Sequence, residues 1–206
     1  MKVVIIGGVA GGATAAARIR RLDEQAEIVV LERSGFISYA NCGLPYYIGG
    51  VIQDQEGLTL QTPQGFWDRF RIDVRVRHEA TAIHREEKTV TVKNLETGEV
   101  TTESYDKLIL APGARPTRPP IPGLDSDRLF SLRTVEDTLA IRAFVEREKP
   151  RTAVLAGGGF ISLELAENLA EMGVQVTIVQ RIPQVMHNLD YDMATFLHAH
   201  LRQKGM

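Results

Sequence analysis

The first part of the chain combines short apolar runs with a glycine-rich turn. Residues 3–6 are all Val or Ile, and residues 7–12 read Gly-Gly-Val-Ala-Gly-Gly. An alanine-rich segment follows over 13–22, and the run over 27–32 has the continuous hydrophobicity of a strand that is buried on both faces. This order predicts a strand, a tight turn, a helix and a parallel strand, which together make a βαβ unit of an α/β fold.

The middle of the chain has the alternation that is typical of half-exposed strands. Apolar and polar residues alternate over 72–76, 89–92 and 100–103, and turn-forming residues at 94–98 separate the last two runs. We expect these three segments to form an antiparallel β-meander. The apolar run 108–111 predicts another buried strand, which ends at a Pro-Gly pair.

A proline-rich stretch divides the chain in two. Four prolines between 116 and 122 predict a stiff, non-helical linker. Beyond it, a helical pattern over 134–149 precedes residues 153–179, which repeat the strand, glycine loop, helix and strand of the N-terminal part. We therefore expect two Rossmann-like dinucleotide-binding domains, one over 1–116 and one over 117–206.

The second of these domains is expected to be truncated. A helical segment begins near residue 190, and the sequence ends at Met206, before the strand to which this helix would lead. We therefore expect the chain to be the N-terminal part of a longer enzyme.

Charge and composition exclude several classes of partner. With 24 Lys and Arg against 26 Asp and Glu, the formal net charge is −2, which gives no attraction for nucleic acid or anionic lipid. The apolar runs are short and no signal-peptide pattern is present, so we expect a cytoplasmic protein with no membrane partner. No histidine has metal-ligand spacing, and no metal site is expected. The single cysteine, Cys42, cannot form an internal disulfide and is either an inert buried thiol or a reactive one.

The first glycine loop has the features of a dinucleotide-binding turn. A backbone that turns sharply from strand to helix and approaches a pyrophosphate needs positions without a Cβ atom. Gly7 and Gly12 occupy two of the three glycine positions of the G-x-G-x-x-G pattern, and Val9 occupies the middle one. Glu32 ends the second strand, where a carboxylate can accept hydrogen bonds from ribose hydroxyls. We expect dinucleotide binding here; the alternative is a purely structural turn.

The second glycine loop repeats the pattern with a different charge. Gly157 and Gly159 occupy the first two positions, and Ser162 replaces the third glycine. Gln180 and Arg181 follow the next strand, where a carboxylate would favour an unphosphorylated ribose. A guanidinium there would accept a 2′-phosphate, so we favour NADPH over NADH. The alternative is that Arg181 simply points into solvent.

The segment 38–50 reads Ser-Tyr-Ala-Asn-Cys-Gly-Leu-Pro-Tyr-Tyr-Ile-Gly-Gly. It closely resembles the active-site segment of coenzyme A disulfide reductases and their persulfide-reductase relatives, which are pyridine nucleotide-disulfide oxidoreductases. The resemblance extends through residues 7–12, Glu32, 105–114 and 157–164. It implies FAD and NAD(P)H as cofactors, and coenzyme A disulfide, a coenzyme A persulfide or polysulfide as the substrate. It also implies a homodimer built with a C-terminal domain, so full activity is not expected of these 206 residues alone.

The same resemblance implies that Cys42 is the nucleophile and forms a mixed disulfide with coenzyme A. Independently, a flavin passes two electrons to sulfur only where a thiolate or disulfide lies against its ring, and Cys42 is the only candidate. No C-x-x-x-x-C pair is present, so the partner sulfur must come from the substrate. The alternative is a buried structural cysteine.

The resemblance also implies a set of ligand contacts. Those to coenzyme A would be Thr14, Arg18, Arg21, Ser38 and Asn41. The first three are spaced by four and then three residues, which puts them on one helix face, and two cations there suit a phosphorylated ligand. The alternative is a solvated basic face that pairs with Asp23 or Glu24. The residues expected to contact a dinucleotide are Gly7, Gly8, Val9, Ala10, Gly11, Gly12, Glu32, Arg33, Asn41, Cys42, Ala80, Ala111, Pro112, Gly113, Gly157, Gly158, Gly159, Phe160, Ile161, Gln180 and Arg181.

Two other functions stay open at this point. An NADH oxidase or peroxidase of the same superfamily would cycle Cys42 through a sulfenic acid. Those enzymes typically have a histidine in the first glycine loop, where this chain has Ala10, so the acid or base that peroxide chemistry needs is absent there. The second alternative is a non-catalytic dinucleotide-binding redox sensor.

Overall fold

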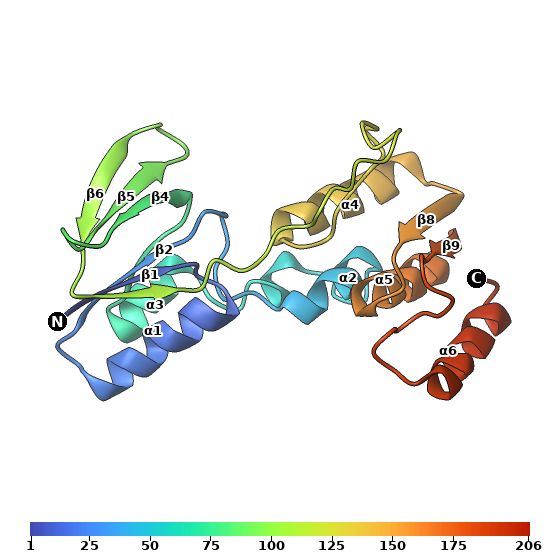
Figure 1. Cartoon of the computed structure of the whole chain (residues 1–206), viewed down its shortest axis with the longest axis horizontal. Coiled ribbons are helices and arrows are strands. Elements are labelled where there is room, and N and C mark those ends of the chain that lie inside the picture. Colours follow the sequence, from blue (N-terminus) through green and yellow to red (C-terminus); the bar gives the residue numbers. More distant parts are fainter. The chain divides into compact units, whose positions relative to one another are not determined.

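The computed structural model describes residues 1–206. The chain folds as two compact units (Figure 1). The first unit comprises Met1–Ala40 and Thr59–Pro120, and the second comprises Asn41–Leu58 and Ile121–Met206. The segment that contains Cys42 therefore packs with the C-terminal part of the chain.

The first unit is built on a four-stranded parallel sheet. Its strands are β1 (Lys2–Ile6), β2 (Glu27–Leu31), β3 (Asp73–Arg75) and β7 (Lys107–Leu110), in the order β3-β2-β1-β7. The two central strands consist almost entirely of Val, Ile and Leu, because both of their faces are covered. The expected α/β fold and the first βαβ unit are confirmed.

Different elements pack on the two faces of this sheet. Successive residues of a strand point to opposite faces. Val3 and Ile5 lie in an apolar core with helix α1 (Ala10–Leu22), whereas Val4 packs with Val90 and Val92 of the antiparallel strands. The uninterrupted apolar run of β1 is thus explained by burial from both sides.

Helix α1 (Ala10–Leu22) packs closely on the sheet because the residues it buries are small. Ala13 and Ala16 are buried together with Ile5 and Val30. The helix begins three residues earlier than its alanine-rich run suggested, inside the glycine loop.

A second helix of this unit, α3 (Pro63–Phe70), was not expected from the sequence pattern. Thr62 caps its start, with its Oγ1 accepting a hydrogen bond from Gly65 N at 3.0 Å. It ends at Arg71, which has a left-handed backbone with φ of 52°. Phe66 is its buried anchor in the core. Figure 1 shows α1 and α3 on the same side of the sheet.

The meander is present, but its first strand was predicted at the wrong place. It consists of β4 (His78–His84), β5 (Thr89–Asn94) and β6 (Val100–Ser104), paired antiparallel in that order. Residues 73–75 instead form β3, a parallel edge strand beside β2. A short edge strand can carry alternating charged residues, so its pattern does not differ from that of a half-exposed antiparallel strand.

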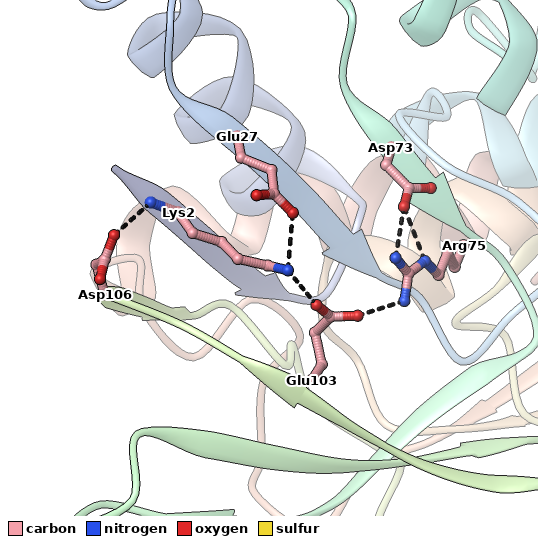
Figure 2. Close-up of polar contacts among 6 residues, drawn as sticks. All are labelled: Lys2, Glu27, Asp73, Arg75, Glu103 and Asp106. Atoms are coloured by element: carbon pink, nitrogen blue, oxygen red, sulfur yellow. Dashed lines mark hydrogen bonds and ion pairs between the residues drawn. The ribbon is translucent and has the colours of Figure 1, made fainter.

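A network of charged side chains connects the meander to the parallel sheet (Figure 2). Glu103 on β6 contacts Lys2 Nζ at 2.6 Å and Arg75 Nη1 at 2.5 Å. Lys2 also contacts Glu27 at 2.7 Å, and Arg75 contacts Asp73 at 2.6 Å. Burial raises the pKa of the Glu103 carboxyl, but the hydrogen bonds from Lys2 and Arg75 outweigh burial and hold this pKa below its usual 4.5.

The second unit contains a two-stranded parallel sheet with helices packed on it. Its elements in chain order are η1 (Asn41–Gly43), α2 (Leu44–Ile48), η2 (Gln55–Gly57), α4 (Val135–Glu148), β8 (Thr152–Ala156), α5 (Phe160–Glu171), β9 (Gln175–Val179) and α6 (Tyr191–Gln203). The strand, glycine loop, helix and strand that were predicted over residues 153–179 are confirmed. The short helix α2 was not expected.

The core of the second unit joins three helices. Ile48 of α2 packs with Ile141 and Val145 of α4 and with Leu165 and Leu169 of α5. These side chains are spaced by three or four residues along α4 and α5, so each helix presents one apolar stripe. In neither unit does any helix have the length and apolar character that crossing a membrane requires.

We predict that Glu103→Gln lowers the free energy of unfolding by about 2 kcal/mol at neutral pH, because it removes the charge from two charge-assisted hydrogen bonds. The folded pKa of Glu103 is depressed, so its stabilisation is present above the unfolded value near 4.5 and is lost as the pH falls through the lower folded value. Urea unfolding between pH 3 and pH 7 measures this difference.

The matched control is Glu99→Gln in the exposed β5–β6 turn, which should change stability little at any pH. Equal effects of the two substitutions at pH 7 would show that the network does not stabilise the first unit.

Candidate functional site

The first glycine loop leaves no room for side chains at two positions. Gly7 has a φ of 98°, and a Cβ atom on it would lie 2.0 Å from the carbonyl oxygen of Ala111. A Cβ atom on Gly12 would lie 1.7 Å from the carbonyl oxygen of Gly7. Both glycines are therefore required by backbone contacts between β1, α1 and the end of β7. The loop ends at the N-terminus of α1, where the first N–H groups of the helix face outward for an anionic group.

Glu32 holds this loop in place with both oxygens of its carboxylate. Gly8 N donates to Oε2 and Ser34 N donates to Oε1, each at 2.7 Å. The residue is 8% exposed. A carboxylate has about four acceptor positions, so each oxygen keeps one for a ribose hydroxyl. The sequence predicted only the ribose contact. The two hydrogen bonds by which Glu32 fixes the loop are seen only in the structure.

The other expected dinucleotide contacts of the first unit lie on several of its elements. Ala111 follows β7 and its N–H donates to Ile6 O at 2.8 Å, which holds the segment that continues into Pro112 and Gly113 beside Gly7. Arg33 follows Glu32 and its Nη1 lies 3.7 Å from Glu79 Oε1. Ala80 lies on β4, where it packs against the core that Val4 forms with Val90 and Val92. Val9, Ala10 and Gly11 form the start of α1.

The second glycine loop has the same order but more open space. Gly157 has a φ of 108° and its N–H donates to Val179 O at 2.8 Å. Gly158 packs on Val185, where a Cβ would approach to 3.0 Å. Gly159 precedes α5 and has an ordinary backbone conformation, and nothing lies within 4 Å of where its Cβ would be. No protein contact demands glycine at 159, so the position fits the close approach of a ligand.

The residues around this loop present polar and apolar groups to solvent. Phe160 and Ile161, at the start of α5, are 63% and 52% exposed. Arg181 follows β9 and is exposed without an ion pair, and its N–H donates to Gln180 Oε1 at 3.1 Å. The Arg181 guanidinium is therefore available for a phosphate group.

Cys42 lies in the single turn η1, directly before α2, and its thiol is exposed. This exposure rules out the alternative of a buried structural cysteine. The neighbouring Asn41 has a buried side-chain oxygen without a hydrogen-bond partner. A buried acceptor that lacks its partner costs about 1–3 kcal/mol, so the arrangement fits a donor supplied by a ligand at the thiol.

Arg18 and Arg21 on α1 make no ion pair, and their one hydrogen bond to the protein joins Arg21 Nε to the Ala17 carbonyl one turn earlier on the same helix. Thr14, Arg18 and Arg21 are exposed on α1, and neither arginine pairs with an acidic residue. Arg20 is different, because its guanidinium donates to the carbonyls of Phe70 and of three other residues. The pairing of this face with Asp23 or Glu24 is therefore absent, whereas its exposure to solvent agrees with the alternative of a solvated basic face.

The structure groups the expected coenzyme A contacts in two places. Thr14, Arg18 and Arg21 lie together on α1 in the first unit. Ser38 is also in that unit, with a left-handed φ of 44° and its N–H donating to Gly8 O at 3.0 Å. Asn41 is adjacent to Cys42 in the second unit.

One buried amide, which contacts the segment after Cys42, was not expected from the sequence. Asn168 on α5 is 1% exposed, and its Oδ1 is buried without a hydrogen-bond partner. The signal was available, because an amide interrupts the apolar stripe formed by Leu165 and Leu169. What it contacts could not be known, since that contact comes from a distant segment.

Comparison with known proteins gives a consistent family. The family model for pyridine nucleotide-disulphide oxidoreductase matches residues 1–206. Coenzyme A disulfide reductase of Staphylococcus aureus strain JH9 is 44% identical over 192 residues, which are 93% of this chain and 43% of that protein. The chain thus spans less than half the length of this curated relative.

Solved structures show the same likeness. The crystal structure of reduced Bacillus anthracis CoADR-RHD has a TM-score of 0.97 and 51% identity, over 99% of this chain and 37% of that one. The structure of an NAD-dependent persulfide reductase from A. fulgidus has a TM-score of 0.95 and 38% identity, over 100% of this chain and 39% of that one.

We predict that Gly12→Ala destabilises the ligand-free protein by about 3 kcal/mol or more, because the added methyl group meets a backbone carbonyl that cannot move aside. The matched control is Gly11→Ala in the same helix turn, where the nearest atom to a Cβ lies at 3.5 Å. That change should be neutral or stabilising by about 0.5 kcal/mol through helix propensity. Urea unfolding followed by circular dichroism compares them, and equal stability of the two variants would refute the steric account.

Proposed function

The chain belongs to the pyridine nucleotide-disulphide oxidoreductase family, and we propose that it is part of an FAD-dependent NAD(P)H:disulfide oxidoreductase with Cys42 as its single redox cysteine. The observation that carries the proposal is the exposed, solitary thiol of Cys42 beside the buried, unpartnered oxygen of Asn41. The chemistry that suits such a site is thiol–disulfide exchange with a disulfide from outside the protein. Coenzyme A disulfide or a coenzyme A persulfide is the proposed substrate, as the names of the similar proteins suggest.

The two glycine loops support two dinucleotides. We assign FAD to the loop Gly7–Gly12 with Glu32, in a domain over residues 1–116, and NAD(P)H to the loop Gly157–Gly159, in a domain over 117–206. The absence of side chains at Gly7 and Gly12 and the open space at Gly159 support these assignments. We also expect the full-length protein to be a cytoplasmic homodimer.

Cys42 performs the sulfur chemistry in this proposal. Its thiolate attacks one sulfur of the substrate disulfide, so that a Cys42–coenzyme A disulfide forms and one coenzyme A thiolate leaves. A bound flavin supplies the two electrons that originate from NAD(P)H. Two-electron reduction of the mixed disulfide would return the Cys42 thiolate and release a second coenzyme A thiolate. Proton uptake from water gives two thiols for each NAD(P)H oxidised.

The substrate's phosphate groups have a proposed contact surface on α1. Arg18 and Arg21 offer two exposed cations without an ion pair, and Thr14 offers an exposed hydroxyl beside them. Coenzyme A is a phosphorylated ligand, and guanidinium groups bind phosphate with strong hydrogen bonds.

We predict that Cys42→Ser in the full-length protein lowers NAD(P)H-dependent reduction of coenzyme A disulfide by about 1000-fold or more, because a serine hydroxyl cannot form the mixed disulfide. Flavin binding, measured from the visible absorbance of the purified variant, should be retained. Reductase activity above about a tenth of the original would remove Cys42 from the reaction. A second assay with oxygen or peroxide as the only acceptor tests the oxidase or peroxidase alternative.

We also predict that Arg181→Ala raises KM for NADPH by about tenfold and leaves KM for NADH unchanged, since the side chain would contact only the 2′-phosphate. The control is Arg151→Ala, because this exposed residue precedes β8 and therefore lies at the end of the strand opposite the glycine loop. Equal changes in KM for the two nucleotides would contradict the assigned role.

A further inference from the structure

The segment that contains Cys42 is held in place by α4 and α5, because the helix that follows it, α2, is too short to be stable by itself. α2 spans only Leu44–Ile48, directly after the turn that contains Cys42. Isolated helices shorter than about 12 residues are marginal in water. α2 packs against α4 and α5, and Ile48 is the residue of α2 that belongs to their common apolar core. What holds α2 on these helices therefore also places the thiol.

Arg142 on α4 binds the C-terminal end of α2. Its Nη1 donates to the carbonyl oxygens of Tyr47 at 3.1 Å, Gln53 at 3.3 Å and Ile52 at 3.4 Å. The guanidinium carbon lies 4.3 Å from the centroid of the buried Tyr47 ring, and Nε is fixed by Glu146 Oε1 at 2.8 Å. A cation at this end of a helix is stabilising, because the last carbonyls have no partner in the helix. One side chain thus holds the segment that follows α2.

Gly49, at the end of α2, lies against the side chain of Asn168 on α5. A Cβ atom on Gly49 would lie 2.1 Å from Asn168 Oδ1 and 2.7 Å from its Cβ. Gly49 has φ of −73° and ψ of −5°, which any residue adopts. The glycine is therefore explained by the close approach of Asn168, and not by its own backbone conformation.

The amide of Asn168 is held rigidly in this contact. Its Nδ2 donates to Glu164 O at 2.8 Å, in the preceding turn of α5, so the side chain has a fixed orientation. Its Oδ1 faces Gly49 without a hydrogen-bond partner. An unsatisfied buried polar group is costly and calls for an explanation other than stability. A rigid amide that fits only a glycine fixes the approach of α2 to α5.

We propose that Arg142, Gly49 and Asn168 form a dock for α2 that positions the Cys42 thiol, and that Arg142 and Asn168 are positioning residues for thiol–disulfide exchange. Because α5 begins at Phe160, directly after the second glycine loop, the dock fixes the thiol segment to the helix that carries this loop. The catalytic part of this proposal rests on the proposed function, whereas the structural part stands without it.

The structural part is tested by amide hydrogen exchange in the 206-residue chain. The amides of Gly49 to Ile52 donate to the carbonyls of Pro45, Tyr46 and Tyr47, so their exchange reports on the end of α2. Arg142→Met should accelerate their exchange by about tenfold or more, through loss of the charged hydrogen bonds. Arg142→Lys, which keeps a cation, should restore part of the protection.

The control is Arg147→Met, the same substitution on the same helix. Arg147 is exposed, pairs with Glu148 and has no contact with α2. Amides of β9 serve as an internal reference for the stability of the unit. Equal acceleration at α2 and at β9 in Arg142→Met, or an equal effect of Arg147→Met, would overturn the dock.

The contact between Gly49 and Asn168 is tested by a double-mutant cycle. Gly49→Ala alone should accelerate exchange at the end of α2 by about tenfold, since the methyl group meets Asn168. In an Asn168→Gly background, the same substitution should have an effect at least about threefold smaller, because the amide has gone. Independent effects of the two substitutions would show that the two residues do not constrain each other.

The functional part is tested with the full-length protein. Arg142→Met should lower kcat with coenzyme A disulfide by about tenfold while KM for NADPH stays unchanged, and Arg142→Lys should recover part of kcat. Unchanged kcat together with accelerated exchange would refute a role in the reaction. If Cys42→Ser also retained activity, the proposed function would be wrong. The hydrogen-exchange measurements would still test whether Arg142, Gly49 and Asn168 hold α2 in place.

Discussion

The structure depends on close backbone approaches that exist only because glycine has no side chain. In the first unit, Gly12 packs on the carbonyl of Gly7, and Gly7 packs on the carbonyl of Ala111. These two approaches bring the start of α1 close to β1 and to the end of β7. In the second unit, Gly49 brings α2 against the amide of Asn168. The first contact shapes the loop to which we assign a dinucleotide, and the second is part of the proposed dock for the segment that contains the thiol.

The chain contains two kinds of arginine that the sequence does not distinguish. Arg20, Arg75 and Arg142 are used by the fold, because carbonyls or carboxylates occupy their guanidinium groups. Arg18 and Arg181 are exposed without an ion pair. Since a guanidinium that is already satisfied has little to offer a phosphate, the available arginines are the ones that fit phosphorylated ligands. They are also residues that the resemblance or the charge pattern had indicated.

Much of the fold could be predicted from the sequence, because buried parallel strands and glycine loops have strong local patterns. The strands at 3–6 and 153–156 and the helix that starts after Thr134 were found in this way. Residues 73–75 were assigned to the wrong sheet because an edge strand alternates like a meander strand. The contacts of Arg142 with Tyr47 join residues 95 apart in the chain, and no local pattern contains such information.

The proposed function requires that the Cys42 thiol exchange with a disulfide from outside the protein and be regenerated by electrons from NAD(P)H. The most direct test is mass spectrometry of the flavin-loaded full-length protein after reaction with coenzyme A disulfide and then with NADPH. We predict one coenzyme A per chain, on the peptide that contains Cys42, and its release after NADPH is added. Absence of the adduct, or an adduct that NADPH does not remove, would contradict the account.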